Sequence, residues 1–161
     1  MPRIQLETVI NAPIAVVFDL ARSIDLHKIS TAHTLEEAIA GKTSGFIGMG
    51  ESVTWRAMHF GMWHELTSKI TAFDPPHYFA DEMQQGAFSG FLHEHIFEQK
   101  GSETLMRDIF DYQSPYDIFG RIADGLFLKK YMRGLLEERN RIIKEFAENE
   151  SLWKEVPGMI L

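Results

Sequence analysis

A chain of 161 residues, 45% of them hydrophobic, is long enough to bury the core of one ordinary domain, and this composition excludes a disordered protein. Its formal net charge of -7 argues against nucleic acid and against an anionic membrane as the main partner, because both attract basic surfaces. The absence of cysteine excludes disulfides, thiolate nucleophiles and zinc–thiolate sites, and fits a reducing cytoplasm.

The N-terminus and the lengths of the apolar runs bear on location. Residues 1–7 place polar side chains where a signal peptide needs an apolar core. No apolar run approaches the roughly 20 residues of a membrane-spanning helix. We therefore expect a cytoplasmic protein with no membrane span.

The first forty residues predict one strand followed by two short helices. Residues 3–10 alternate apolar and polar side chains, which indicates a strand with one buried face. Asn11 and Pro13 are typical of a helix start, and apolar residues then recur at helical spacing. Ser23 is expected to cap a second helix that ends near Ile29, and residues 34–40 are weakly strand-like.

A loop is expected from Gly41 to Gly50, because this stretch carries four glycines. Phe46, Ile47 and Met49 are apolar residues inside that loop. Either these side chains pack on the core, or they border the mouth of a pocket and move with a ligand.

A succession of strand-like runs fills the chain from Glu51 to Tyr112, separated by short turns rich in glycine and proline. Serial runs joined by short turns predict an antiparallel meander. Alternate residues of a strand share a face, so one face carries His93 and His95, and a face of the last run carries Asp108. Histidines and a carboxylate mixed with aromatic residues suggest the wall of a pocket.

The C-terminal third predicts a long helix and an apolar tail. No proline interrupts residues 118–148, and apolar residues recur there at helical spacing, which predicts a helix of up to about 30 residues. Its charged residues, Arg139 among them, are assigned to a solvated face. Residues 1–150 are expected to form a single domain, and the tail, residues 151–161, either folds back on it or contacts a second subunit or a protein partner.

Several short motifs occur in an order that matches a known superfamily. They are Ile10-Asn11-Ala12-Pro13 with Val17-Phe18, Trp55-Arg56-Ala57-Met58-His59-Phe60-Gly61, Phe73-Asp74-Pro75-Pro76, His93-Glu94-His95-Ile96-Phe97, and Thr104-Leu105-Met106-Arg107-Asp108 with Tyr112. On these residues the chain resembles the SRPBCC superfamily, also described as START-like or Bet v 1-like, and more narrowly its bacterial polyketide cyclase/dehydrase-like branch. The resemblance implies an α+β helix-grip fold: a curved antiparallel sheet of about six to seven strands wrapped around the long helix, with a cavity between them.

Two functions follow from that resemblance and from the residues themselves. The first is the binding of a hydrophobic or aromatic small molecule, lipid-like or polyketide-like, in the cavity. Its lining is expected to comprise Trp55, His59, Met83, Phe91, His93, His95, Asp108, Phe110, Tyr112, Leu126 and Phe127. The alternative is an acid–base cyclase or dehydratase, in which His95 and Asp108 are the catalytic residues. A homodimer or a protein partner bound through the C-terminal tail is a third hypothesis.

The His93-x-His95 pair also raises the question of a metal. Two histidines two apart on a strand can share an ion, with Asp108 or His59 as a third ligand. A hydrogen-bonded polar lining is the plainer interpretation, so we expect no metal and no cofactor. The glycines between Gly45 and Gly50 do not form a phosphate-binding loop, because no Lys-Ser/Thr pair follows them.

Overall fold

The computed structural model describes residues 2–114 and 127–159 of the chain. In chain order its elements are β1 (Arg3–Ile10), α1 (Ile14–Ala21), α2 (Ile24–Ser30), a 3-10 helix (Ala32–Thr34), β2 (Glu37–Gly41), β3 (Ser52–His59), β4 (Met62–Asp74), β5 (Tyr78–Gln85), β6 (Gly90–Lys100), β7 (Glu103–Gln113), α4 (Lys129–Ala147) and α5 (Glu150–Trp153).

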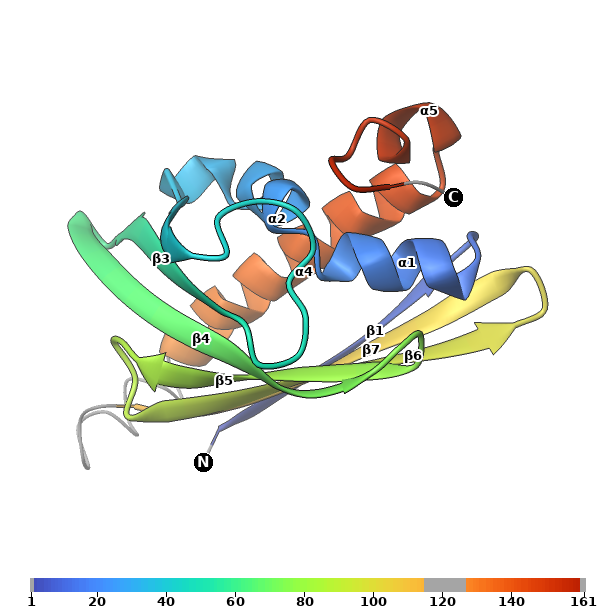
Figure 1. The fold of residues 1–161 in the computed structure, drawn as a ribbon. Coiled ribbons are helices and arrows are strands. Elements are labelled where there is room, and N and C mark those ends of the chain that lie inside the picture. Colours follow the sequence, from blue (N-terminus) through green and yellow to red (C-terminus); the bar gives the residue numbers. More distant parts are fainter. Residues whose placement is uncertain (1, 115–126, 160–161) are drawn as a thin grey trace.

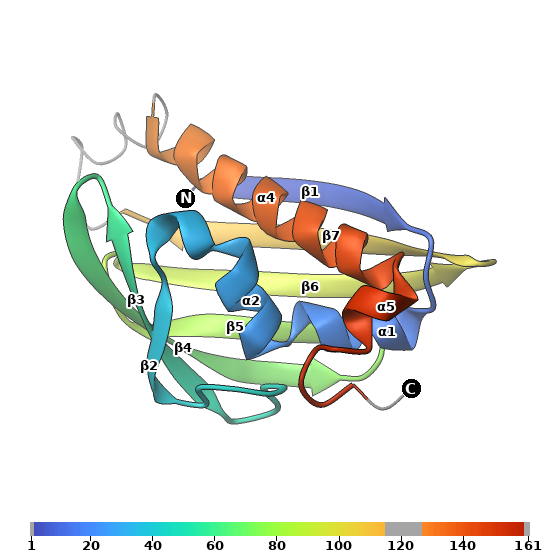
Figure 2. The ribbon, with the colours of Figure 1, turned by 90° about the horizontal axis from the view of Figure 1, so that it is seen from above.

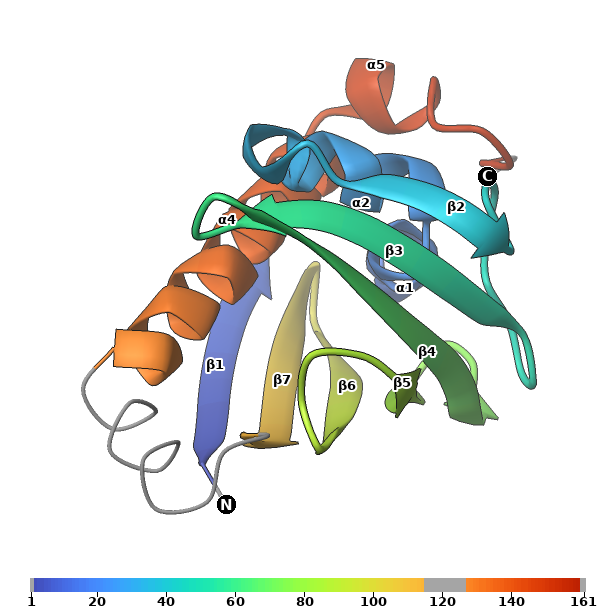
Figure 3. The ribbon, with the colours of Figure 1, turned by 90° about the vertical axis from the view of Figure 1, so that its left-hand side faces the viewer.

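The strands form one antiparallel sheet of seven strands in the order β1-β7-β6-β5-β4-β3-β2. The sheet is curved, and all the helices lie on its concave side (Figure 1). Seen from above, α4 crosses the sheet obliquely on the side of β1 and β7, and α1 and α2 lie beside it over the middle strands (Figure 2). The curvature is clearest end-on, where β2, β3 and β4 turn over toward the helices (Figure 3). The predicted α+β helix-grip fold is confirmed.

The helix boundaries agree in part with the sequence patterns. The Ser23 hydroxyl caps α2 as expected, accepting a hydrogen bond of 3.1 Å from the Leu26 N–H. Asn11 does not cap α1: that helix begins after Pro13, and the Ile14 N–H donates instead to the side chain of Gln99 at 2.8 Å. The predicted long helix corresponds to α4, and its expected extension over residues 118–126 lies outside the described residues.

Replacing Ser23 with alanine is expected to destabilise the protein by about 1 kcal/mol, because the Leu26 N–H loses its acceptor in a buried position. Chemical denaturation monitored by circular dichroism measures this change. Ser44→Ala, in the exposed part of the glycine-rich loop, is the matched control and is expected to change the free energy of unfolding very little. Equal effects of the two substitutions would contradict the capping role.

The described residues form two apolar core clusters. The first surrounds Phe18, whose ring centroid lies 5.4 to 5.6 Å from those of Phe73, Phe79 and Phe97. The buried members of the second, named here the aromatic cluster, are Ile4, Leu6, Phe91, Phe110, Tyr112 and Leu136. Strands β6 and β7 and helix α4 each carry residues of both clusters. On each of these elements, the residues that lie between the two clusters form a separate layer.

The C-terminal tail lies against the body of the protein. Trp153 and Val156 are buried members of the first cluster, and Met159 packs partly on it. Since these apolar side chains are occupied within the chain, a partner that used them would first have to displace the tail. Among the described residues, no helix is both long enough and apolar enough to cross a membrane.

Candidate functional site

A layer of polar side chains separates the two apolar clusters, and four elements build it. On β6, for example, Phe91 belongs to the aromatic cluster, Phe97 belongs to the first cluster, and two histidines lie between them. The same order of apolar, polar and apolar residues recurs on β5, β7 and α4. The members of this polar layer are Asp81, His93, His95, Asp108, Arg139 and Asn140.

Asp108 is at the centre of the layer and is fully buried. Its Oδ1 accepts from His93 Nε2 at 2.9 Å and from Arg139 Nη1 at 3.3 Å, and its Oδ2 accepts from Asn140 Nδ2 at 2.7 Å. Burial alone raises the pKa of Asp108, but hydrogen bonds from His93 and His95 and the charge of Arg139 hold it well below its ordinary 3.8. Asp108 is therefore a carboxylate at neutral pH.

His93 presents one nitrogen without a partner. Burial, together with the neighbouring His95, lowers the pKa of His93 to about 4, so the ring is neutral at pH 7. Its single proton belongs on Nε2, which faces the Asp108 carboxylate. Nδ1 is then an acceptor, and within the described ranges it has no hydrogen-bond partner, since the Asp81 oxygen nearest to it is 4.0 Å away.

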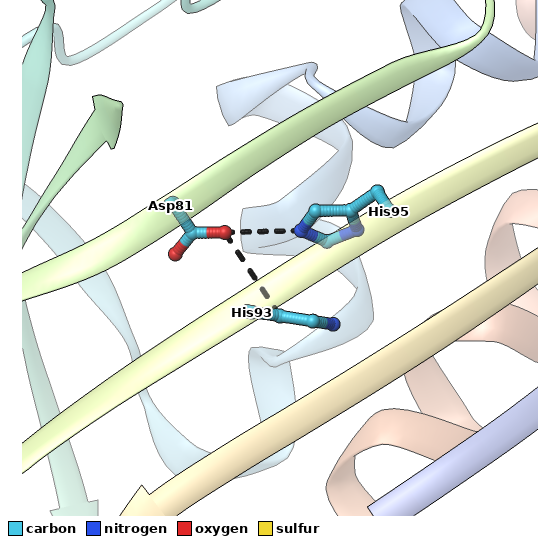
Figure 4. Close-up of side chains that lie close together, drawn as sticks. All are labelled: Asp81, His93 and His95. Atoms are coloured by element: carbon cyan, nitrogen blue, oxygen red, sulfur yellow. Dashed lines mark hydrogen bonds and ion pairs between the residues drawn. The ribbon is translucent and has the colours of Figure 1, made fainter. Parts of the chain in front are cut away.

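His95 lies between two carboxylates. Its Nε2 is 3.0 Å from Asp81 Oδ1 (Figure 4), and its Nδ1 is 3.2 Å from Asp108 Oδ1. The ring of Phe79 stacks on it at a centroid distance of 4.1 Å. Burial raises the pKa of Asp81, but the hydrogen bond from His95 and the two nearby histidines outweigh this and lower it. His95 is thus held in place on both nitrogens and on one face.

Three of these side chains have the donor set of a metal site. Asp81, His93 and His95 each offer one ligand atom, and these atoms lie within 4.8 Å of one another (Figure 4). The two imidazole rings, however, lie 3.8 Å apart at an interplanar angle of 37°, so their in-plane lone pairs run beside one another more than toward one point. This geometry suits ring stacking better than a shared cation, and the absence of a metal stays a prediction.

The aromatic cluster borders the polar layer directly. The edge of His93 meets the ring of Phe110 at 5.2 Å, and Phe88 lies over Phe91, Phe110 and Tyr112 at 5.5 to 6.4 Å. Several apolar side chains that pack on this cluster are only partly buried: Leu66, Met83, Phe88, Leu128 and Met132. An apolar surface that is incompletely covered therefore adjoins a neutral imidazole.

The structure divides the predicted lining residues into groups. Met83, Phe91, Phe110 and Tyr112 belong to the aromatic cluster or pack on it, next to His93, His95 and Asp108 in the polar layer. Trp55, His59 and Phe127 do not join this group.

Trp55 lies in the first cluster, with its ring centroid 4.4 Å from that of His27. His59 Nδ1 is 2.6 Å from the hydroxyl of Tyr131, at the end of β3. Phe127 is 59% exposed and contacts Phe60, while Leu126 lies outside the described residues.

Three members of the polar layer were missed from the sequence. The assignment of Arg139 to a solvated face is wrong, because its side chain is buried and bonded to Asp108, Asn140 and the Ala21 carbonyl. Asn140 lies on the buried face of α4 with Leu136, Ile143 and Ala147. The helical spacing of these four residues was the signal in the sequence that could have identified Asn140 as buried. For Asp81 the signal was its place between Phe79 and Met83 on one strand face.

A pocket of about 370 Å³ lies outside this site, between α1, the glycine-rich loop and the β4–β5 turn. Phe18, Arg22, Phe46 and Phe73 line it. The loop therefore does border a pocket, although not the expected one: Phe46 lines it, while Ile47 is buried in the core and Met49 is exposed. A ligand cavity between the sheet and α4 stays a prediction.

These features define a helix-grip protein with a buried polar layer beside an aromatic cluster. No family model matches the chain, and no curated protein matches it. Among solved structures it is similar to TTHA0849 from Thermus thermophilus, with 20% sequence identity, a TM-score of 0.73 and coverage of 89% of this chain and 95% of the other. It is also similar to ginseng major latex-like protein 151 from Panax ginseng, with 17% identity, a TM-score of 0.66 and coverage of 91% and 97%.

A third similar structure is the KanY protein, with 15% identity, a TM-score of 0.71 and coverage of 92% of this chain and all of the other. At such identities the likeness concerns the fold alone. It agrees with the helix-grip architecture, in which the sheet, the short helices and the long C-terminal helix occupy these same relative positions.

Proposed function

We propose that this protein binds a hydrophobic or aromatic small molecule between the sheet and α4, with the apolar body of the molecule on the aromatic cluster. The observation that carries the proposal is His93 Nδ1, an acceptor without a partner in the described ranges, on a buried ring that contacts Phe110. An acceptor that no protein group occupies is available to a hydroxyl or N–H of a ligand.

The charges of the polar layer support a neutral ligand with a hydrogen-bond donor. The carboxylates of Asp81 and Asp108 lie within 4.0 Å of the ring nitrogens of His93, so an anionic group of a ligand beside His93 would meet like charges at short range. Asp108 fixes the tautomer of His93, and that tautomer accepts a hydrogen bond from a ligand. A phenol or an enol on an apolar skeleton meets both requirements.

Two probes of the same shape test this proposal. We expect 2-naphthol to bind about tenfold more tightly than 2-methylnaphthalene, because only the hydroxyl can donate to His93 Nδ1. The preference should disappear in His93→Phe and persist in the control His77→Phe, which changes an exposed histidine in a turn. Competition titrations give the affinities. Equal binding of the two probes, or a preference that survives in His93→Phe, would contradict the assignment.

An acid–base enzyme is the second candidate function. The observation that favours it is the contact of both histidines with Asp108, since a carboxylate that orients an imidazole is the arrangement of a general base. His95 and Asp108 are the proposed catalytic residues, and the resemblance to polyketide cyclases and dehydratases suggests the reaction class.

If this second proposal holds, aromatic β-ketone substrates should turn over, and both His95→Ala and Asp108→Asn should lower the rate by about 100-fold or more. The measurement is a pH–rate profile of each folded variant, whose acidic limb should vanish in His95→Ala. Turnover that is unchanged in His95→Ala, or absent across such ketones in the unsubstituted protein, counts against catalysis at this site.

A further inference from the structure

Four large hydrophobic side chains are exposed at one end of the molecule. Phe60 is 56% exposed, Met62 64%, Trp63 47% and Phe127 59%. Three of them lie in or beside the β3–β4 turn, and the fourth precedes α4. The rings of Phe60 and Phe127 are 5.4 Å apart, so the two segments meet. We call these four residues the hairpin patch.

The backbone of the β3–β4 turn indicates that the exposure of Phe60 does not serve stability. Phe60 has a φ of 53°, in the left-handed region that glycine and asparagine adopt most easily. A bulky residue there is strained, and its ring, although it lies 4.6 Å from that of Tyr131, stays more than half exposed. Strain at an exposed aromatic residue is a sign of a functional role.

Positive charge adjoins the hairpin patch at the start of α4. Residues 127–133 include Lys129, Lys130 and Arg133 and no acidic residue, and all three cations are exposed. Arg133 pairs with Glu137 at 3.0 Å, whereas the two lysines make no ion pair within the described residues. The Arg56 guanidinium lies 4.3 Å from the ring of Trp63.

We propose that the hairpin patch is a docking surface for an anionic lipid bilayer. Exposed aromatic side chains next to lysine and arginine are the combination that inserts at the headgroup level of membranes. The net charge of -7 does not decide this, because charges farther than about 8 Å from the bilayer are screened at physiological ionic strength. The proposal goes beyond the proposed function and does not depend on it.

The shape of the hairpin patch favours a bilayer over a protein partner. Met62 and Trp63 are adjacent in β4 and therefore point to opposite faces of the strand. Apolar side chains thus project on both sides of a hairpin end. A fluid bilayer can surround such a tip, whereas a flat protein surface covers one side of it.

Sedimentation of the full chain with vesicles tests the proposal. We expect binding to vesicles of phosphatidylcholine with one quarter phosphatidylglycerol, about tenfold weaker binding to pure phosphatidylcholine, and a blue shift of tryptophan emission on binding. Phe60→Asn, which suits the positive φ, and Lys129→Glu with Lys130→Glu should each reduce binding to the anionic vesicles at least tenfold. The matched controls are Met49→Asn and Lys154→Glu, also at exposed positions, which should bind as the unsubstituted chain does.

Three results would overturn the proposal: no binding to anionic vesicles, equal binding to both vesicle types, or patch variants that bind like their controls. A dimer seen by light scattering that disappears in Phe60→Asn would also overturn it, by assigning the patch to a second copy of the chain. Titration with 2-naphthol in the absence of vesicles reports on the ligand site separately, so the two proposals can fail independently.

Discussion

Replacing Asp108 with alanine is expected to destabilise the protein by about 3–5 kcal/mol, because the substitution leaves the Arg139 guanidinium buried without its carboxylate. His93 and Asn140 lose an acceptor in the same step, in a layer that solvent does not reach. Urea denaturation at pH 7, followed by circular dichroism, measures this change in the free energy of unfolding.

The matched control is Asp111→Ala on the same strand. Asp111 pairs with Arg3 at 2.7 Å at the surface, and an ion pair of that kind contributes about 0–1 kcal/mol. A second variant separates the lost charge pair from lost packing: Asp108→Ala combined with Arg139→Met should be more stable than Asp108→Ala alone, because no unpaired charge is left buried. Equal costs for Asp108→Ala and Asp111→Ala would mean that Asp108 does not organise the polar layer.

The second large effect expected is a loss of stability in mild acid. The pKa of His93 is about 4 in the folded protein, whereas an unperturbed histidine, as in the unfolded chain, has a pKa of 6.5. Between pH 4 and pH 6.5 the unfolded chain therefore binds a proton at His93 that the folded chain does not bind. The contribution of His93 to the free energy of unfolding is fully present above pH 6.5. It falls by about 3 kcal/mol as the pH is lowered to 4. The lowered pKa values of Asp81 and Asp108 add a further loss only at still lower pH.

Urea denaturation at intervals between pH 7 and pH 4 tests this expectation with His93→Gln. Between pH 7 and pH 4 the free energy of unfolding of that variant should fall by about 3 kcal/mol less than that of the unsubstituted protein. Some decrease should remain, because burial also lowers the pKa of His59. His77→Gln is the control, since His77 is exposed in a turn, and should keep the full dependence. A dependence in His93→Gln as steep as in the unsubstituted protein would show that His93 does not stay neutral.

The order of the elements, and the side of the sheet to which each strand residue points, follow from the amino-acid pattern alone. Alternation along β6 and β7 placed His93, His95 and Asp108 correctly on the concave face, because a strand fixes the side of each residue with a period of two. The motif order similarly predicted the helix-grip fold. Periodicity acts within one element, which is why these predictions needed no knowledge of neighbours.

Which polar groups meet, by contrast, depends on the packing of the folded chain. The β5–β6 register sets Asp81 opposite His93, and the β6–β7 register sets Asp108 opposite His95, yet the shorter hydrogen bonds run diagonally, from His93 to Asp108 and from His95 to Asp81. The rotation of α4 against the sheet then buried Arg139. Strand register and helix rotation result from the packing of the whole core. No local pattern specifies them, and for that reason the polar layer, with His93 Nδ1 open to a ligand, emerges only in the folded chain.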